Sequence, residues 1–289
     1  MAVVALCLHP DRDRVVDAAT SAARWLLDRG HEVRLSEEDA ATADLPELAV
    51  GATALLDGLD LAVSLGGDGT MLRTVDLVAD RATPVIGVNL GTLGYLTEVE
   101  PQHVVEALER FLAGDHSLDL RMRLAVEVEA GGGGGTSPCA VTALNEAVVG
   151  KTPTGQIVRV RVVIDGEHLT TYAADGIIIA TPTGSTAYAW SAGGPIVSPD
   201  HAALLLTPVA PHMLFDRSLV LPPSSRIRLE IASDRPATLS IDGRTLGPLH
   251  QGDAVVCTMS PRPASIVTFR PRGFLRILKA KFGLDGREA

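Results

Sequence analysis

The chain has 289 residues, of which 46% are hydrophobic, 21% are charged and only 3% are aromatic. This composition is typical of a globular protein with an aliphatic core, and the length favours two domains or one large one. The formal net charge of -10 argues against a nucleic-acid partner, because binding to a phosphate backbone requires clustered Lys and Arg. No run approaches the roughly 20 apolar residues that cross a bilayer, so we expect no membrane partner and a soluble protein.

The first 120 residues alternate apolar runs with helical patterns, which is typical of a parallel sheet covered by helices. The predicted strands are Ala2–Leu8, His31–Leu35, Leu61–Leu65 and Val85–Asn89, and the predicted helices are Asp13–Arg29, Met71–Val78 and Val104–Leu112. Cys7 and the two later cysteines, Cys139 and Cys257, are far apart and lack zinc-type spacing. They are interpreted as reduced, mostly buried thiols of a cytoplasmic protein.

After about residue 120 the pattern changes to short strands separated by turn signals. Val158–Ile164 alternates apolar and polar residues, Asp165-Gly166 supplies a type I′ turn signal, and Leu169–Ala173 returns, which predicts a hairpin. The run Gly131–Gly135 is interpreted as a flexible hairpin loop. Further strands are predicted at Ile227–Ile231, Thr238–Ile241, Ala254–Met259 and Ile266–Phe269, so this region should be mainly β and sandwich-like.

Phe274–Phe282 at the end of the chain is a basic amphipathic segment. A membrane-surface helix is one interpretation, and a helix that returns to the first domain is the favoured one. The predicted organisation is therefore an α/β domain with a parallel sheet, formed by residues 1–120 and 270–289, and a mainly β domain of residues 121–269.

The sharpest local motif is Gly66-Gly67-Asp68-Gly69-Thr70, between a buried strand and the start of a helix. Glycines allow close backbone approach to a ligand, and the amides at a helix N-terminus favour an anion. A carboxylate in such a turn needs a purpose: Asp68 accepts a proton from a hydroxyl, binds a metal ion or merely caps the helix. Leu72 occupies the third glycine position of the dinucleotide fingerprint, so that motif is absent.

Two later stretches also carry chemistry. The long run from Asp175-Gly176 through Thr181–Pro195 leads from an apolar strand into small and hydroxylated residues, which suits a ligand surface with many hydrogen bonds. Asn145-Glu146 is a polar pair inside the apolar strand predicted at Ala143–Val149. Buried polar residues must be satisfied or used, so this pair is either a ligand contact or a structural network.

In this order, the motifs resemble those of the NAD kinase family over most of the chain. Gly-Gly-Asp-Gly is shared with lipid kinases and phosphofructokinases, whereas the Thr181–Pro195 stretch is specific. The resemblance implies phosphorylation of the 2′-hydroxyl of the adenosine ribose of NAD to give NADP. The donor would be ATP, or polyphosphate, with Mg²⁺ or another divalent metal. It also implies a homodimer or homotetramer.

The resemblance also implies residue roles. Asp68 would be the general base, Gly66, Gly67, Gly69 and Thr70 would form the phosphate loop, and no protein ligand is assigned to the metal. The residues implied to bind NAD are Asp68, Gly69, Arg73, Asn145, Glu146, Gln156, Asp175, Thr183, Thr186, Ala187, Tyr188, Ala189, Trp190, Ser191 and Arg244. Ala173 lies where relatives carry varied side chains and offers no charge. The alternatives are a lipid or sugar kinase with the same glycine turn and a non-catalytic dinucleotide-binding regulator.

Overall fold

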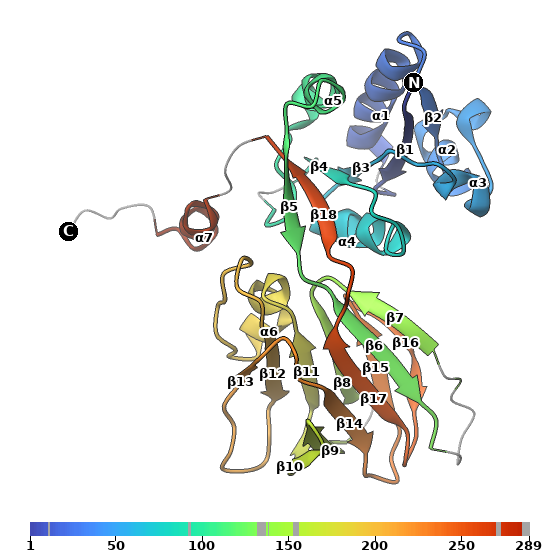
Figure 1. Cartoon of the computed structure of the whole chain (residues 1–289). Coiled ribbons are helices and arrows are strands. Elements are labelled where there is room, and N and C mark those ends of the chain that lie inside the picture. The colour runs from blue at the N-terminus through green and yellow to red at the C-terminus, as the bar shows by residue number, and fades with distance from the viewer. Residues whose placement is uncertain are drawn as a thin grey trace. The chain divides into compact units, whose positions relative to one another are not determined.

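A computed structural model of the chain describes residues 1–10, 12–91, 94–131, 137, 139–152, 156–269 and 273–284 (Figure 1). The chain forms two compact units. Unit 1 consists of Met1–Leu120 and Ala264–Ala289, and unit 2 of Arg121–Pro263. None of the described helices has the length and apolar character needed to cross a bilayer.

Unit 1 is an α/β domain. Its strands are β1 (Val3–Leu8), β2 (Glu32–Arg34), β3 (Leu61–Gly66), β4 (Val85–Asn89), β5 (Ser117–Arg121) and β18 (Ala264–Thr268). They form one sheet in the order β2-β1-β3-β4-β18-β5, in which β1 pairs in parallel with β2 and β3, and β4 with β3 and β18. β1 and β3 are almost continuously apolar because helices cover both of their faces.

The helices of unit 1 are α1 (Arg12–Leu27), α2 (Glu37–Ala43), α3 (Ala52–Leu56), α4 (Asp68–Leu77), α5 (Val104–Leu112) and α7 (Phe274–Phe282), with 3-10 turns at Pro46–Leu48 and Pro101–His103. Ala19, Ala22 and Leu26 recur at helical spacing on α1 and are fully buried. They share a core with Leu108 of α5 and with β1 and β3, whereas α4 lies on the other face of the sheet (Figure 1).

Unit 2 is a sandwich of two six-stranded antiparallel sheets. Its strands are β6 (Leu124–Glu129), β7 (Cys139–Ala143), β8 (Glu146–Lys151), β9 (Val158–Ile164), β10 (Glu167–Ala174), β11 (Gly176–Ala180), β12 (Leu204–Val209), β13 (Leu219–Leu221), β14 (Ile227–Ile231), β15 (Ala237–Ile241), β16 (Arg244–Leu249) and β17 (Ala254–Met259). The sheet orders are β10-β9-β14-β17-β6-β7 and β13-β12-β11-β8-β15-β16, and one apolar core contains residues of both sheets.

The predicted fold class is confirmed. The β9–β10 hairpin also forms as predicted, with Asp165 and Gly166 at φ 51° and 88°, the left-handed values that a type I′ turn requires. β6 and β7 pair in antiparallel fashion, as a hairpin around the glycine run predicts, although residues 132–135 of that run lie outside the described part of the chain.

Three details differ from the sequence-based predictions. The strand predicted at Ile266–Phe269 is β18 of the first sheet, so the second unit ends at Pro263 rather than at residue 269. The parallel pairing of β18 with β4 places this strand in unit 1. The sequence of a short apolar strand does not indicate which sheet the strand joins. α4 begins at Asp68, three residues before the predicted Met71.

The polar pair is the third difference, because Asn145 lies in a bend between β7 and β8 rather than inside a strand. The cysteines are mostly buried, as predicted. Cys7 and Cys257 are buried, and burial raises the pKa of each thiol to about 12, which suits inert core residues. Cys139, near the start of β7, is exposed.

Candidate functional site

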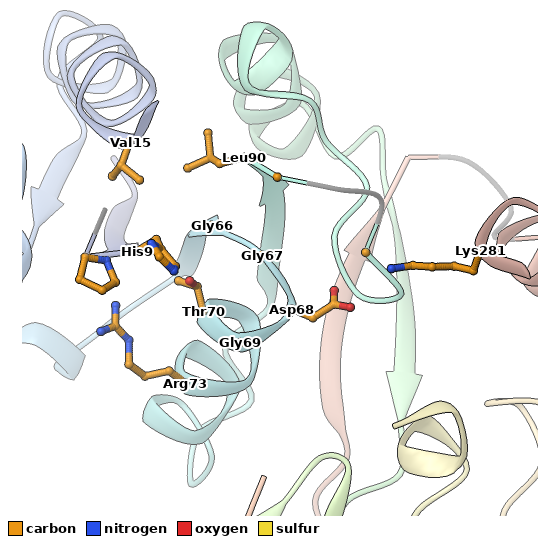
Figure 2. Close-up of a pocket in the computed structure, with 13 residues that line it drawn as sticks. His9, Val15, Gly66, Gly67, Asp68, Gly69, Thr70, Arg73, Leu90 and Lys281 are labelled. Carbon is orange, nitrogen blue, oxygen red and sulfur yellow. The ribbon is translucent and has the colours of Figure 1, made fainter. Parts of the chain in front are cut away.

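Unit 1 contains a cavity of about 680 Å³ at the carboxyl ends of its parallel strands. His9, Gly67 and Leu90, which follow β1, β3 and β4, all line it (Figure 2). Parallel strands end at the same edge of a sheet, so residues distant in sequence meet there. Arg73 of α4 and Lys281 of α7 also line the cavity.

The glycine turn presents backbone amides to this cavity. Gly67 is the N-cap of α4 and makes no side-chain capping hydrogen bond. The first N–H groups of a helix have no acceptor within the helix, and together with the helix dipole they favour an anion. At Gly66 an ideal Cβ would lie 2.1 Å from Thr70 Oγ1, so glycine is needed for Thr70 to pack beneath the turn. The turn is therefore suited to phosphate.

The Asp68 carboxylate does not cap its helix. Its Oδ2 accepts a hydrogen bond from Tyr95 N–H at 2.9 Å, and its Oδ1 accepts one from Leu96 N–H at 3.0 Å. Gly94 lies so close that an ideal Cβ would come within 2.4 Å of Asp68 Oδ1. Two amides and a close backbone thus fix the carboxylate in the cavity wall, where it ties the glycine turn to the backbone of residues 95 and 96 and is placed to accept a proton or to bind a metal ion.

Arg73 is fixed one helical turn beyond Asp68. Its guanidinium donates to the backbone oxygen of Leu8 and lies 3.4 Å from Asp39 Oδ1. The Asp39 carboxylate, mostly buried, also accepts from Leu8 N–H at 3.0 Å and from the Ser36 hydroxyl at 2.8 Å. Asp39 therefore ties the end of β1 to α4 and compensates the charge of Arg73.

In unit 2, Asp242 holds the bend that carries the predicted polar pair. Its Oδ2 accepts from Leu144 N–H at 2.8 Å, and its Oδ1 accepts from Asn145 and Glu146 N–H at 2.8 and 3.0 Å. Asp242 is in the left-handed region, with φ 47°, in the turn between β15 and β16. Three amides on one carboxylate define the position of this bend.

Glu146 is buried at the bend, with only 6% of its surface exposed. Its Oε2 has no hydrogen-bond partner within the described part of the chain. Burial, followed by the negative charge of Asp242, raises the pKa of Glu146 to about 8, and a hydrogen bond from the Tyr188 backbone acts in the opposite direction. A buried polar atom without a protein partner is uncommon, and a water molecule, an ion or a ligand can supply the missing hydrogen bond.

The hydroxyl-rich loop packs directly against this bend. Thr181 Oγ1 donates to Leu144 O at 2.5 Å, and Thr181 N–H donates to Asn145 O at 2.8 Å. At Gly184 an ideal Cβ would lie 2.2 Å from Asn145 O, so only glycine allows the loop to approach so closely. Buried Arg121 donates to Thr183 Oγ1 at 3.4 Å. Asn145, Glu146 and the start of the loop therefore form one cluster.

The structure places the remaining predicted residues around and beyond this cluster. Tyr188 and Trp190 of α6 (Tyr188–Ser191) are 45% and 43% exposed, whereas Ala189 between them is fully buried against β11 and β12. Asp175 forms an ion pair with Lys151 at 2.8 Å and lines, with Tyr188, a cavity of about 350 Å³. Gln156 and Arg244 are exposed, and Ala173 is half-buried.

Sequence reasoning missed three residues that shape these sites: Asp39, Gly94 and Asp242. Nothing in the sequence near Asp242 links it to Asn145, which lies 97 residues away. Gly94 belongs to a Gly-Thr-Leu-Gly stretch after β4, the kind of glycine-rich signal that marks close backbone approach. Asp39 lies in an ordinary acidic helix start and gave no signal.

Comparison with known proteins shows which family has this fold and these motifs. Residues 4–116 match the model of the ATP-NAD kinase N-terminal domain, and residues 144–269 match that of the ATP-NAD kinase C-terminal domain. An NAD kinase of Heliobacterium modesticaldum is 40% identical over 287 residues, which cover 97% of this chain and 98% of that protein. The chain belongs to the NAD kinase family. NAD kinase 1 of Streptomyces avermitilis is 38% identical over 99% of this chain and 88% of its own length.

Two solved structures are also similar to this chain along nearly its whole length. Yeast NADH kinase in complex with NADH has a TM-score of 0.91 and 27% identity, covering all of this chain and 89% of its own. An NAD kinase from Archaeoglobus fulgidus in complex with ATP has a TM-score of 0.74 and 25% identity, covering 99% of this chain and 100% of its own. The family catalyses the phosphorylation of NAD to NADP.

Proposed function

We propose that this chain is an NAD kinase, which transfers the terminal phosphoryl group of ATP to the 2′-hydroxyl of the adenosine ribose of NAD. The observation that carries the proposal is the Asp68 carboxylate, oriented by Tyr95 and Leu96 amides beside an anion-binding turn. Family membership supplies the substrates, and this geometry supplies a base next to a phosphate site.

In the proposed reaction, Asp68 accepts the proton of the 2′-hydroxyl as its oxygen attacks the γ-phosphorus. A ribose O–P bond forms, the bond from γ-phosphorus to the bridging oxygen breaks, and ADP leaves with that electron pair. The hydrogen bonds from Tyr95 and Leu96 N–H and the nearby Gly94 backbone restrict the rotation of the Asp68 carboxylate. Little reorganisation of this carboxylate is therefore needed before proton transfer. Proton transfer of this kind contributes roughly 10²- to 10⁴-fold to a rate.

The donor phosphates would lie against Gly66, Gly67, Gly69 and Thr70, with Arg73 nearby. The described residues contain no group of three or more His, Cys, Asp or Glu side chains that could hold a metal ion. Mg²⁺ usually keeps several waters and binds substrate phosphates, so with Asp68 assigned as the base we propose that the donor phosphates would supply its ligands, with no protein ligand assigned. The ion would enter as part of MgATP and would neutralise phosphate charge.

NAD itself is proposed to bind residues of unit 2. The unpartnered Oε2 of buried Glu146 supports a ligand hydrogen bond at the Asn145–Glu146 bend, and the exposed rings of Tyr188 and Trp190 offer stacking surfaces. Ala189 packs its side chain into the core against β11 and β12, so its proposed contact with NAD would be made by its backbone. The other proposed contacts are Gln156, Asp175, Thr183, Thr186, Ala187, Ser191 and Arg244.

The proposal is tested by incubating the purified chain with NAD and MgATP and measuring NADP with an NADP-specific dehydrogenase. Asp68→Asn, which keeps one of the two acceptor oxygens, should still fold and should lower kcat by about 10²- to 10⁴-fold. A wild-type chain that phosphorylates a lipid or sugar but not NAD would favour the alternative kinases. Binding of NAD without NADP formation would favour a regulator. Polyphosphate and NADH, substituted in turn, measure donor and acceptor choice.

We also propose a homo-oligomer, a dimer or tetramer, in the cytoplasm. The support is the family resemblance, together with Cys7, Cys139 and Cys257, which are free thiols as expected in a reducing compartment. Light scattering at the concentration of the activity assay measures the assembly. A fully active monomer would contradict the oligomer, and recovery of the protein outside the cytoplasmic fraction would contradict its location.

A further inference from the structure

A second long cationic side chain, that of Lys281, lines the cavity beside Asp68 and has no role in the reaction proposed above. Lys281 lies on α7, near the end of the described chain, and lines the same cavity as the glycine turn. Figure 2 shows its side chain extending into the cavity, with the ammonium group on the side of the Asp68 carboxylate. Helix α7 thus reaches the cavity beside the turn that follows β3.

Tyr95 links this cation to the proposed base. Its backbone N–H bonds the Asp68 carboxylate, and its ring lies beneath the Lys281 ammonium, with Nζ 5.1 Å from the ring centroid. A cation over an aromatic face is attracted by the ring and keeps its donors free for other partners. One residue therefore positions both the carboxylate and the ammonium group.

The charges of the two long cations in the cavity are used differently. Arg73 is engaged by Asp39 and by the Leu8 carbonyl on the side of the cavity near His9. Lys281 forms no ion pair with any described carboxylate, and its side chain is exposed. Its positive charge is therefore available to an anion that enters the cavity.

Phosphoryl transfer requires such a charge. The protein carries a formal net charge of -10, so its overall field repels a nucleoside triphosphate. As the ribose O–P bond forms and the bond to the leaving oxygen breaks, negative charge accumulates on the β-phosphate of ADP. Cations placed in advance at that position stabilise the transition state more than the ground state.

We propose that Lys281 is a catalytic residue that binds the β- and γ-phosphates of the donor and neutralises the charge developing on the leaving group. This inference rests on the proposed kinase function and adds α7 to the machinery of the site. It also gives the C-terminal helix a chemical role, because α7 carries the ammonium group to the cavity.

The test compares full-length Lys281→Gln with Lys279→Gln, which removes the same charge from an exposed position two residues earlier on the same helix. MgATP affinity is measured by calorimetry without NAD, and kcat and KM are measured for both substrates. Lys281→Gln should weaken MgATP binding and lower kcat/KM for ATP by about 10- to 100-fold. KM for NAD should stay within about twofold, and Lys279→Gln should change nothing by more than that.

Unchanged MgATP affinity and turnover in Lys281→Gln would overturn the inference, as would an equal loss in Lys279→Gln, which would reduce the effect to helix charge. The two proposals fail separately. If wild-type protein binds MgATP but makes no NADP, the kinase proposal fails while the binding comparison still tests Lys281. If NADP forms and Lys281→Gln matches wild type, only the role of Lys281 fails.

Discussion

At the residue scale, the best-defined feature is the contact between Asp68 and the backbone that follows β4. The carboxylate accepts hydrogen bonds from two backbone amides, and Gly94 lies against its Oδ1. These protein contacts fix both its position and its orientation. Catalysis by a positioned base depends on such fixation, because a displacement of about 1 Å can lower a rate about 100-fold. Gly94 is the residue through which this dependence can be measured.

We predict that Gly94→Ala displaces the Asp68 carboxylate and lowers kcat for NADP formation by about 10- to 100-fold. An ideal Cβ at Gly94 would lie 2.4 Å from Asp68 Oδ1 and 2.5 Å from Thr97 Oγ1, so one of these groups must move. Gly51→Ala, at an N-cap where a Cβ meets nothing within 4 Å, is the matched control. Wild-type turnover in Gly94→Ala would show that the carboxylate tolerates displacement.

At the element scale, the bend between β7 and β8 is defined by two other elements. The β15–β16 turn provides the Asp242 carboxylate on one side, and the loop after β11 presses Gly184 against Asn145 on the other. Both contacts involve backbone atoms, which cannot rotate away as a flexible side chain would. These contacts therefore hold Glu146 in a buried position, although burial is unfavourable for its ionised carboxylate.

We predict that Gly184→Ala destabilises unit 2 by about 1–3 kcal/mol and raises KM for NAD. The added Cβ would lie 2.2 Å from Asn145 O, so the loop must separate from the bend. Urea unfolding and steady-state kinetics measure the two effects. Gly150→Ala in β8, where a Cβ meets only ordinary contacts at 3.6 Å or more, should change stability by less than about 1 kcal/mol. Equal effects of both variants would contradict this account of the bend.

Elements with local signals were predictable from sequence, whereas contacts between elements were not. The Asp165-Gly166 hairpin and the strand–turn–helix around Asp68 follow from neighbouring residues, and both form. The hydroxyl-rich loop was singled out through its composition. Asp242 and Gly94 reach their partners only through tertiary packing. The sequence around Asn145 was predicted as one strand because its neighbours are apolar and contain no Gly or Pro to mark the bend.

At the scale of the whole molecule, Glu146 links stability to pH. Its pKa rises from 4.5 in the unfolded chain to about 8 in the folded protein, so the folded state binds the proton more tightly. The stability contributed by this proton is complete below about pH 4.5 and is lost as pH rises through about 8. The cause is the cost of an ionised carboxylate in a buried site beside Asp242.

We predict that Glu146→Gln removes this pH dependence and makes the protein more stable than wild type above about pH 8. The gain should be on the order of a few kcal/mol at most, because the amide needs no proton to remain neutral. Urea unfolding at pH 5.5, 7 and 8.5 measures it, with exposed Glu127→Gln on β6 as the control. The same pH profile in Glu146→Gln and wild type would show that Glu146 titrates normally.

The position of β18 in the first sheet determines the order in which the chain can be completed during synthesis. β18 lies between β4 and β5, yet it begins at Ala264, after every strand of unit 2 has been made. On the ribosome, the N-terminal domain therefore begins first and is completed later, with the edge of β4 that pairs with β18 left open until β18 emerges. The inserted β-sandwich has all of its strands earlier, so a nascent chain stalled before β18 would carry one complete domain and one open sheet.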